Sequence, residues 1–343
     1  MRIDRKEIPY WIAASGLYPN IKGRAEKINS LLVKIIKEKQ LTLEDFFQLD
    51  KSALETEYGM GKQELFEIEK AKTNLPNFAF LTDELYNSGC EAIPISSDDY
   101  PPILKRNLKF SSPPLLYIKG NKKILKEPNA AAIVGSRDAS KVSLDFTDNI
   151  AKLFSRDYTV VVSGFAKGVD RQALDSAVKY GDQSIIVLPQ GILTFKTNDY
   201  YSSIAEGNVI ALSTFHPKSP WSKELAMARN ATIYNLANKV YVAQSSDKGG
   251  TWSGAMAALK KNNTVYVRMP EAGENNANLE LIKAGAKPVD FNGEAIITDY
   301  HKRAETDPPA DTYTAEKIPK LKKKQGTKKG KKKKSVDGQM KMF

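Results

Sequence analysis

Residues 131–137 read AAIVGSR, and residues 160–170 read VVVSGFAKGVD. Each stretch is an apolar run that ends in a glycine turn, and helical apolar spacing follows each turn, at residues 143–154 and 169–180. The apolar runs are continuous rather than alternating, which is typical of strands buried on both faces of a parallel sheet. We therefore predict that strand, glycine turn and helix repeat along this part of the chain.

The same pattern continues toward residue 268. We expect strands at 131–135, 159–163, 184–188, 209–213, 240–243 and 264–268, and crossover helices at 143–154, 169–180, 221–236 and 252–259. A short apolar strand should follow the proline-rich turn at 112–114. These elements predict an α/β fold, a doubly wound, mainly parallel Rossmann-like sheet over residues 86–295.

Residues 1–85 are expected to form a small helical module, because apolar residues recur at helical spacing from Arg24 to about Ala71. The turn Tyr58-Gly59-Met60-Gly61 resembles a helix-hairpin-helix or SAM-like element, whose glycines let a turn approach a DNA backbone. The segment after this turn carries three glutamates, at positions 64, 67 and 69, which would repel phosphate. A plain packing unit is the favoured interpretation.

The positive charge is concentrated at the C-terminal end of the chain. Of the formal net charge of +12, residues 317–343 carry +11 and residues 1–316 carry only +1. Few apolar residues follow position 296, so we expect residues 296–343 to be a disordered lysine-rich tail. The first residues are charged, no apolar run could span a membrane, and Cys90 is the only cysteine. We therefore expect a cytoplasmic protein without membrane contact.

Three glycine turns should meet at one edge of the sheet, because ligands bind outside the carboxyl ends of parallel strands. The turns are Gly135-Ser136-Arg137, the segment from Gly164 to Gly168 with Lys167, and Gly249-Gly250-Thr251. Glycine permits close backbone approach, the free N–H groups of a following helix attract anions, and Arg137 and Lys167 add charge. The pattern predicts a phosphate-binding edge.

The first two of these turns, in this order and spacing and followed by Arg229-Asn230, resemble the DprA/Smf family, and the segment from Lys248 to Trp252 around the third turn resembles a divergent branch of it. Tyr100-Pro101 and the segment 113–121 resemble its lead-in, so the resemblance covers roughly residues 86–290. It implies a homodimer that binds single-stranded DNA in a basic pocket and passes it to a RecA-type recombinase. Lys223, Arg229 and Asn230 match its pocket positions. The chain departs from the family at Ala226, Ala231 and Gln244, where an aromatic residue, a second arginine and an acid are usual.

Two further interpretations stay open. The sheet also resembles LOG-type nucleoside-phosphate hydrolases, but the segment after Gly249-Gly250-Thr251 lacks their catalytic glutamate. A nucleotide sensor could use the same turns for a small ligand. We expect no catalytic residue, cofactor or metal.

The last five residues resemble the short peptides by which bacterial proteins dock on the DNA sliding clamp. Gln339 supplies a hydrogen-bonding amide, and Met340, Met342 and Phe343 supply apolar anchors at the end of a long tether. We expect the sliding clamp to be a further partner.

Overall fold

The fold is built around one sheet of nine strands, seen in a computed structural model that describes residues 3–19, 21–196, 198–261 and 263–297. The strands lie in the order β1-β2-β6-β5-β4-β3-β7-β8-β9. Their bounds are β1 Cys90–Pro94, β2 Leu115–Gly120, β3 Ala130–Val134, β4 Val160–Ser163, β5 Ser184–Val187, β6 Val209–Ser213, β7 Lys239–Val242, β8 Thr264–Arg268 and β9 Lys287–Val289.

The predicted doubly wound α/β architecture is confirmed. Strands β6-β5-β4-β3-β7-β8-β9 are parallel to their neighbours, whereas β1 and β2 join the sheet antiparallel. Every residue of β3, β4, β5 and β6 is buried, which explains their continuous apolar runs. Strand β3 lies between β4 and β7. Strands β4, β5 and β6 are added on one side of β3, and β7, β8 and β9 are added on its other side. This reversal creates a crevice at the carboxyl ends of β3 and β7.

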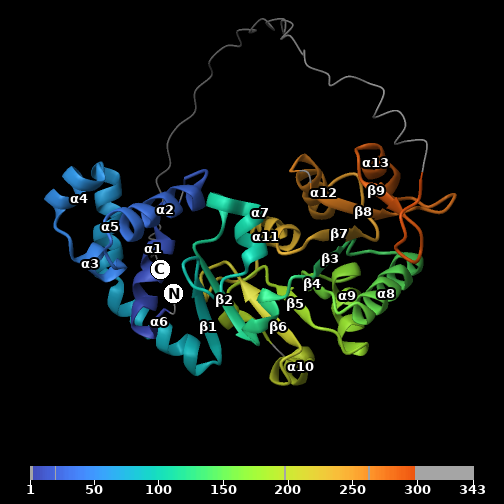
Figure 1. Ribbon diagram of the computed structural model, residues 1–343, viewed down its shortest axis with the longest axis horizontal. Helices are drawn as coiled ribbons and strands as arrows, with labels where there is room; N and C mark the ends of the chain where they lie inside the picture. The colour runs from blue at the N-terminus through green and yellow to red at the C-terminus, as the bar shows by residue number, and fades with distance from the viewer. Residues whose placement is uncertain (1–2, 20, 197, 262, 298–343) are drawn as a thin grey trace, which may run out of the picture. The chain divides into compact units, whose positions relative to one another are not determined.

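Helices cover both faces of the sheet (Figure 1). One face packs against α7, α11, α12 and α13, and the other against α8 and α9. The bounds are α7 Pro102–Leu108, α8 Lys141–Arg156, α9 Val169–Lys179, α10 Tyr201–Ala205, α11 Lys223–Asn235, α12 Gly250–Lys260 and α13 Asn278–Lys283. Of the helices in the described ranges, none combines the length and apolar character that a membrane span needs.

Six further helices precede the sheet: α1 Ile8–Gly16, α2 Arg24–Val33, α3 Leu43–Gln48, α4 Lys51–Tyr58, α5 Lys62–Thr73 and α6 Leu75–Asn87. Their core is continuous with part of the sheet, because one apolar cluster runs from Trp11 and Phe46 to Tyr117 and Ile186. All described residues belong to one compact unit. The division at residue 85 therefore stays a prediction.

The turn between α4 and α5 supports the packing interpretation. Met60 is buried, and the Glu64 carboxylate accepts a hydrogen bond from the Gly61 N–H at 3.0 Å and pairs with Lys27 at 2.7 Å. The N–H group that would approach a phosphate is therefore already occupied. The predicted disordered tail lies outside the described residues.

Several elements were not predicted: helices α1, α7, α10 and α13 and strands β1 and β9. Helix α1 is apolar on almost every side, so it shows little helical periodicity. Strand β1 includes Glu91 and ends at Pro94, and β9 has only three residues, one of them Pro288. Short edge strands with proline carry a weak sequence signal.

Candidate functional site

The predicted turns surround a pocket in the crevice at the carboxyl ends of β3 and β7. It is a cavity of about 320 Å³. Eight of the predicted residues line it: Gly135, Ser136, Arg137, Lys223, Arg229, Asn230, Gly250 and Thr251. The other three, Gly164, Lys167 and Gly168, are not among its lining residues. The first and third turns thus form the pocket directly, and the second contributes Ala166 and Asp170 instead.

The first two glycine turns pack tightly against each other. A Cβ atom on Gly135 would lie 2.5 Å from Val169 Cγ2, and one on Gly168, whose φ is +85°, would overlap the carbonyl oxygen of Ser136. That carbonyl accepts a hydrogen bond from the Val169 N–H at 3.2 Å. Both glycines are needed for this close contact, whether or not a ligand is bound. Lys167 lies outside it, 82% exposed and 3.5 Å from Asp138.

A buried ion pair forms the floor of the pocket. Arg229 on α11 is 3% exposed and Asp170 on α9 is 7% exposed, with 3.7 Å between Arg229 Nη1 and Asp170 Oδ2. The same guanidinium donates to the carbonyl of Val187 at 3.2 Å. A Cβ atom on Gly164 would overlap Nη1 of Arg229. The second glycine turn therefore makes room for the arginine side chain.

The Asp170 carboxylate is held from several directions. Burial raises the pKa of Asp170, and the Arg229 guanidinium and the backbone N–H groups of Gly135 and Ala166 act in the opposite direction. Burial also lowers the pKa of Arg229, but from an ordinary value so high that the guanidinium keeps its proton. Asp170 was not predicted as a site residue. The sequence signal that could have identified it is an acidic residue in the first turn of a helix that follows a glycine loop.

The third turn connects α11, α12 and β3. Asn230 Nδ2 donates to the carbonyl of Gly250 at 3.1 Å, and Thr251 Oγ1 donates to the carbonyl of Gly135 at 3.0 Å. Tyr234, which also lines the pocket, donates through its hydroxyl to the carbonyl of Thr251 at 3.1 Å. Asn230 and Thr251 thus maintain the shape of the pocket through contacts within the protein.

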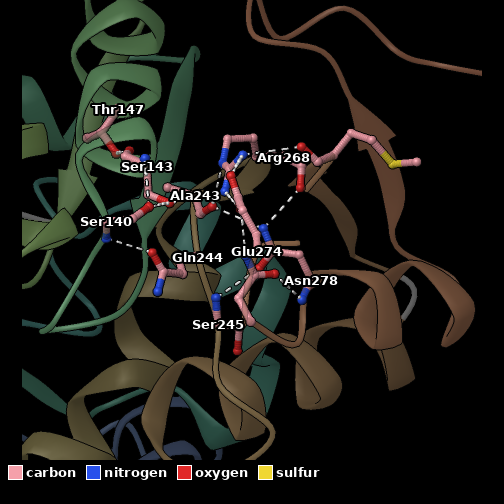
Figure 2. Close-up of polar contacts among 11 residues, drawn as sticks. Ser140, Ser143, Thr147, Ala243, Gln244, Ser245, Arg268, Glu274 and Asn278 are labelled. Atoms are coloured by element: carbon pink, nitrogen blue, oxygen red, sulfur yellow. Dashed lines mark hydrogen bonds and ion pairs between the residues drawn. The ribbon is translucent and has the colours of Figure 1, made fainter. Parts of the chain in front are cut away.

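A polar network behind the pocket anchors the segment that follows β7. Figure 2 shows Asn278 between Ala243, Ser245 and Arg268. Its side chain accepts from the Ser245 N–H at 2.8 Å and donates to the carbonyls of Ala243 and Arg268 at 3.0 and 2.9 Å. Arg268 is buried and pairs with Glu274. The start of the Ser245–Gly249 segment, part of which lines the pocket, is therefore held in place.

Gln244 has a structural partner in the same network. Its side-chain oxygen accepts from the Ser140 N–H at 2.8 Å (Figure 2). Its backbone carbonyl accepts from the Ser136 N–H at 2.9 Å. The segment after β7 is thereby attached to both ends of the loop between β3 and α8. A neutral amide at this position leaves the cations of the pocket without an acidic neighbour there.

Three cations at the rim form no ion pair with any described residue, although Arg137 lies near enough to the Asp170 carboxylate to lower its pKa. Arg137, Lys223 and Lys248 are exposed and line the pocket, and within the described part of the chain none of them makes an ion pair. Other cations nearby are paired, such as Lys167 with Asp138 and Arg171 with Asp175 and Asp199. Unpaired cations around a pocket favour an anionic ligand. Lys248 was visible in the motif before Gly249, but was not selected.

Two aromatic residues beside the glycine turns, Phe165 and Trp252, pack within the protein. Phe165, at a φ of +61°, lies 5.5 Å from Phe195 and 5.7 Å from Tyr200 between ring centroids. Trp252 packs half-buried against the core of the sheet. Neither residue is among those that line the pocket.

Comparisons with known proteins bear on this arrangement. The family model for DNA recombination-mediator protein A matches residues 91–301, which is more than half of the chain. The chain is 27% identical to DNA processing protein DprA of Bacillus subtilis over 241 residues, covering 69% of this chain and 79% of that protein. It is 29% identical to DprA of Streptococcus pneumoniae over 196 residues, covering 56% of this chain and 68% of that protein.

Solved structures show the same fold. The X-ray structure of Streptococcus pneumoniae DprA covers 84% of this chain and 95% of its own, with a TM-score of 0.64 and 23% identity. A structure of Helicobacter pylori DNA processing protein A, which binds single-stranded DNA, covers 58% of this chain and 90% of its own. Its TM-score is 0.50 and its identity 27%.

Proposed function

Because the chain belongs to the DNA recombination-mediator protein A family, we propose that the pocket between β3 and β7 binds the phosphate backbone of single-stranded DNA. The observation that carries the proposal is the set of three unpaired rim cations, Arg137, Lys223 and Lys248. Each would neutralise a phosphate and release its counterions. The Helicobacter pylori relative, which binds single-stranded DNA, supports the choice of ligand.

The residues of the pocket take different roles in this proposal. Arg137 forms bidentate contacts with phosphate oxygens, and Lys223 and Lys248 contact neighbouring phosphates as point charges. Arg229 adds positive potential from below while its charge is balanced by Asp170. Lys167 guides the strand from outside the pocket. The remaining predicted residues shape the cavity: Gly135, Ser136, Gly164, Gly168, Asn230, Gly250 and Thr251.

A concave pocket favours a flexible strand. Duplex DNA has a persistence length of about 50 nm, so bending the duplex to bring its phosphates into such a cavity costs free energy. A flexible single strand does not have this cost. The expected preference is therefore for single strands. We further propose that a homodimer passes the bound strand to a RecA-type recombinase in the cytoplasm.

The C-terminal tail contributes separately to this proposal. Its lysines, between positions 317 and 334, add affinity without sequence preference. Gln339, Met340, Met342 and Phe343 dock on the DNA sliding clamp, which brings the protein to replicating DNA. These residues lie outside the described ranges, so this part rests on the sequence. A peptide ending at Phe343 that fails to bind purified clamp at high micromolar concentration would remove it.

The alternative is a small nucleotide as ligand. A hydrolase would need a base, and Asp170 is the only carboxylate among the lining residues. Its oxygens are engaged by Arg229 and by two backbone N–H groups. Asp170 is therefore better suited to hold the floor than to activate water. A nucleotide sensor needs no base and would use the same rim cations.

The test measures fluorescence anisotropy of labelled single-stranded and duplex oligonucleotides over a salt series. In a chain that ends at Glu316, three phosphate contacts predict a slope of log K against log salt near about −2, at roughly 0.7 per contact. Arg137→Ala should reduce the magnitude of that slope by about 0.7. Lys179→Ala is the control, because that exposed lysine on α9 does not line the pocket and pairs with Asp148.

Two results would contradict the proposal. In the first, DNA binding disappears with the tail and Arg137→Ala changes nothing in the full chain. In the second, a mononucleotide displaces the oligonucleotide at equal phosphate concentration, which would favour the nucleotide sensor.

A further inference from the structure

A second cavity is lined by residues between positions 11 and 110, and it shares no lining residue with the pocket between β3 and β7. It is a groove of about 480 Å³ between helices α1 and α2 on one side and the segments around β1 and α7 on the other. Its apolar lining includes Trp11, Leu32, Val33, Ile36, Ile95 and Phe110. The groove therefore exposes apolar side chains to solvent. A contiguous exposed apolar patch is uncommon on a soluble protein unless a partner covers it.

Large apolar side chains in the groove are exposed to water. Phe110 is 53% exposed and Val33 is 38% exposed. The backbone around Phe110 is held in place, because Asn29 Nδ2 donates to the carbonyls of Phe110 and Ser112 at 2.7 and 2.8 Å. Lys109, just before it, has a φ of +51°, a strained value for a residue with a side chain. The Asn29 hydrogen bonds and the strained backbone at Lys109 thus fix the position of Phe110 at the groove.

Lysines alone supply the charge of the groove. Lys37, Lys105 and Lys109 line it, and no aspartate or glutamate does. All three lysines are exposed and form no ion pair with any described residue. Lys105 donates to the carbonyl of Ile95 at 3.1 Å. An occupant of complementary charge must be acidic.

Three residues that line the groove each hold a buried polar atom that lacks a partner. Trp11 Nε1, Asn29 Oδ1 and Ser96 Oγ are buried and make no hydrogen bond within the described residues. They comprise a donor, an acceptor and a hydroxyl that can act as either. A peptide backbone carries both kinds of group, whereas an acyl chain carries neither along its length.

We propose that this groove binds an acidic peptide that presents a large apolar side chain. The apolar side chain packs between Val33 and Phe110, and the carboxylates pair with Lys37, Lys105 and Lys109. A single DNA strand is the competing occupant, because its phosphates would pair with the same lysines and its bases would stack on Phe110. The displacement experiment below distinguishes it from a peptide. The site is independent of the DNA pocket, so its failure and the failure of the DNA proposal are separate results.

The test uses the full chain and a labelled octapeptide of five aspartates followed by glycine, leucine and phenylalanine. Anisotropy should show saturable micromolar binding that weakens as salt rises. Phe110→Ser should weaken binding about tenfold or more, because the peptide loses its apolar contact. Lys109→Glu should weaken it about fivefold. Both side chains are exposed, so the variants should fold.

Matched controls separate the groove from general surface effects. Phe80→Ser removes an exposed phenylalanine on α6 that does not line the groove, and Lys62→Glu reverses an exposed lysine on α5. Both variants should bind the peptide as the unchanged chain does.

Four outcomes would overturn the proposal. The first is no binding at millimolar peptide, and the second is equal binding of a peptide with serines in place of the aspartates. The third is an equal effect of Phe110→Ser and Phe80→Ser on peptide binding. The fourth is displacement of the peptide by a single-stranded oligonucleotide that the Arg137→Ala variant still binds, because the groove would then be a DNA site.

Discussion

The Arg229–Asp170 pair under the pocket leads to a double-mutant prediction. Arg229→Met and Asp170→Asn each leave one partner of a buried pair without its counterpart. Arg229 Nε already lacks a hydrogen-bond partner, so the guanidinium has only the Val187 carbonyl to compensate for the loss of Asp170. Breaking such a pair from one side costs about 3–5 kcal/mol. Replacing both residues should cost far less than the sum, because no buried charge is then left unpaired.

Urea denaturation followed by circular dichroism measures the three variants against the unchanged chain. We expect a coupling free energy of about 3 kcal/mol or more between the two positions. Singles that cost under about 1 kcal/mol, or effects that add to within about 0.5 kcal/mol, would refute the ion-pair reasoning.

The same double variant tests what Arg229 does for DNA. A side chain that is 3% exposed is expected to support the pocket from below and to make no phosphate contact of its own. The salt slope of DNA binding should then be unchanged in the double variant. A slope reduced by about 0.7, as expected for Arg137→Ala, would show that Arg229 neutralises a phosphate directly.

Three further predictions concern other parts of the chain. Burial raises the pKa of Asp182 from 3.8 to about 6, so the stability that its neutral form contributes is complete below pH 4 and is lost as pH rises through 6. Asp182→Asn should therefore raise the free energy of unfolding by about 1–3 kcal/mol at pH 8 and leave it unchanged at pH 4, and equal effects in thermal melts at both pH values would contradict this. Gly168→Ala should cost about 2–4 kcal/mol, more than Gly285→Ala, where φ is also positive but a Cβ would meet nothing; equal losses in urea melts would mean that contact with Ser136 is unimportant. Lys248→Ala should lower the magnitude of the DNA salt slope by about 0.7, additively with Arg137→Ala, and no change would remove Lys248 from the site.

The candidate site was predictable where function follows from position along a strand. Residues that end a parallel strand must lie at the carboxyl edge, so the turns at Gly135 and Gly250 could be placed together without coordinates. The roles of individual side chains could not. Lys167 lies in the glycine motif but contacts Asp138 and does not line the pocket. Lys248, which was not among the predicted residues, does line it and forms no ion pair with a described residue.

The order of apolar runs and glycine turns by itself determined the class of fold, because continuous apolar strands need helices on both faces. It also located the edge of the sheet that carries the candidate site. Only the tertiary structure decided that Arg229 is buried against Asp170 and that Gly164 makes room for its guanidinium. It also decided that lysines from the helical turn after α2, from α7 and from the segment after α7 meet around one apolar groove. The physical reason is the distance along the chain over which each kind of interaction acts. Periodicity and turn chemistry act within a few neighbouring residues, whereas ion pairing and burial depend on which distant segments the fold brings into contact.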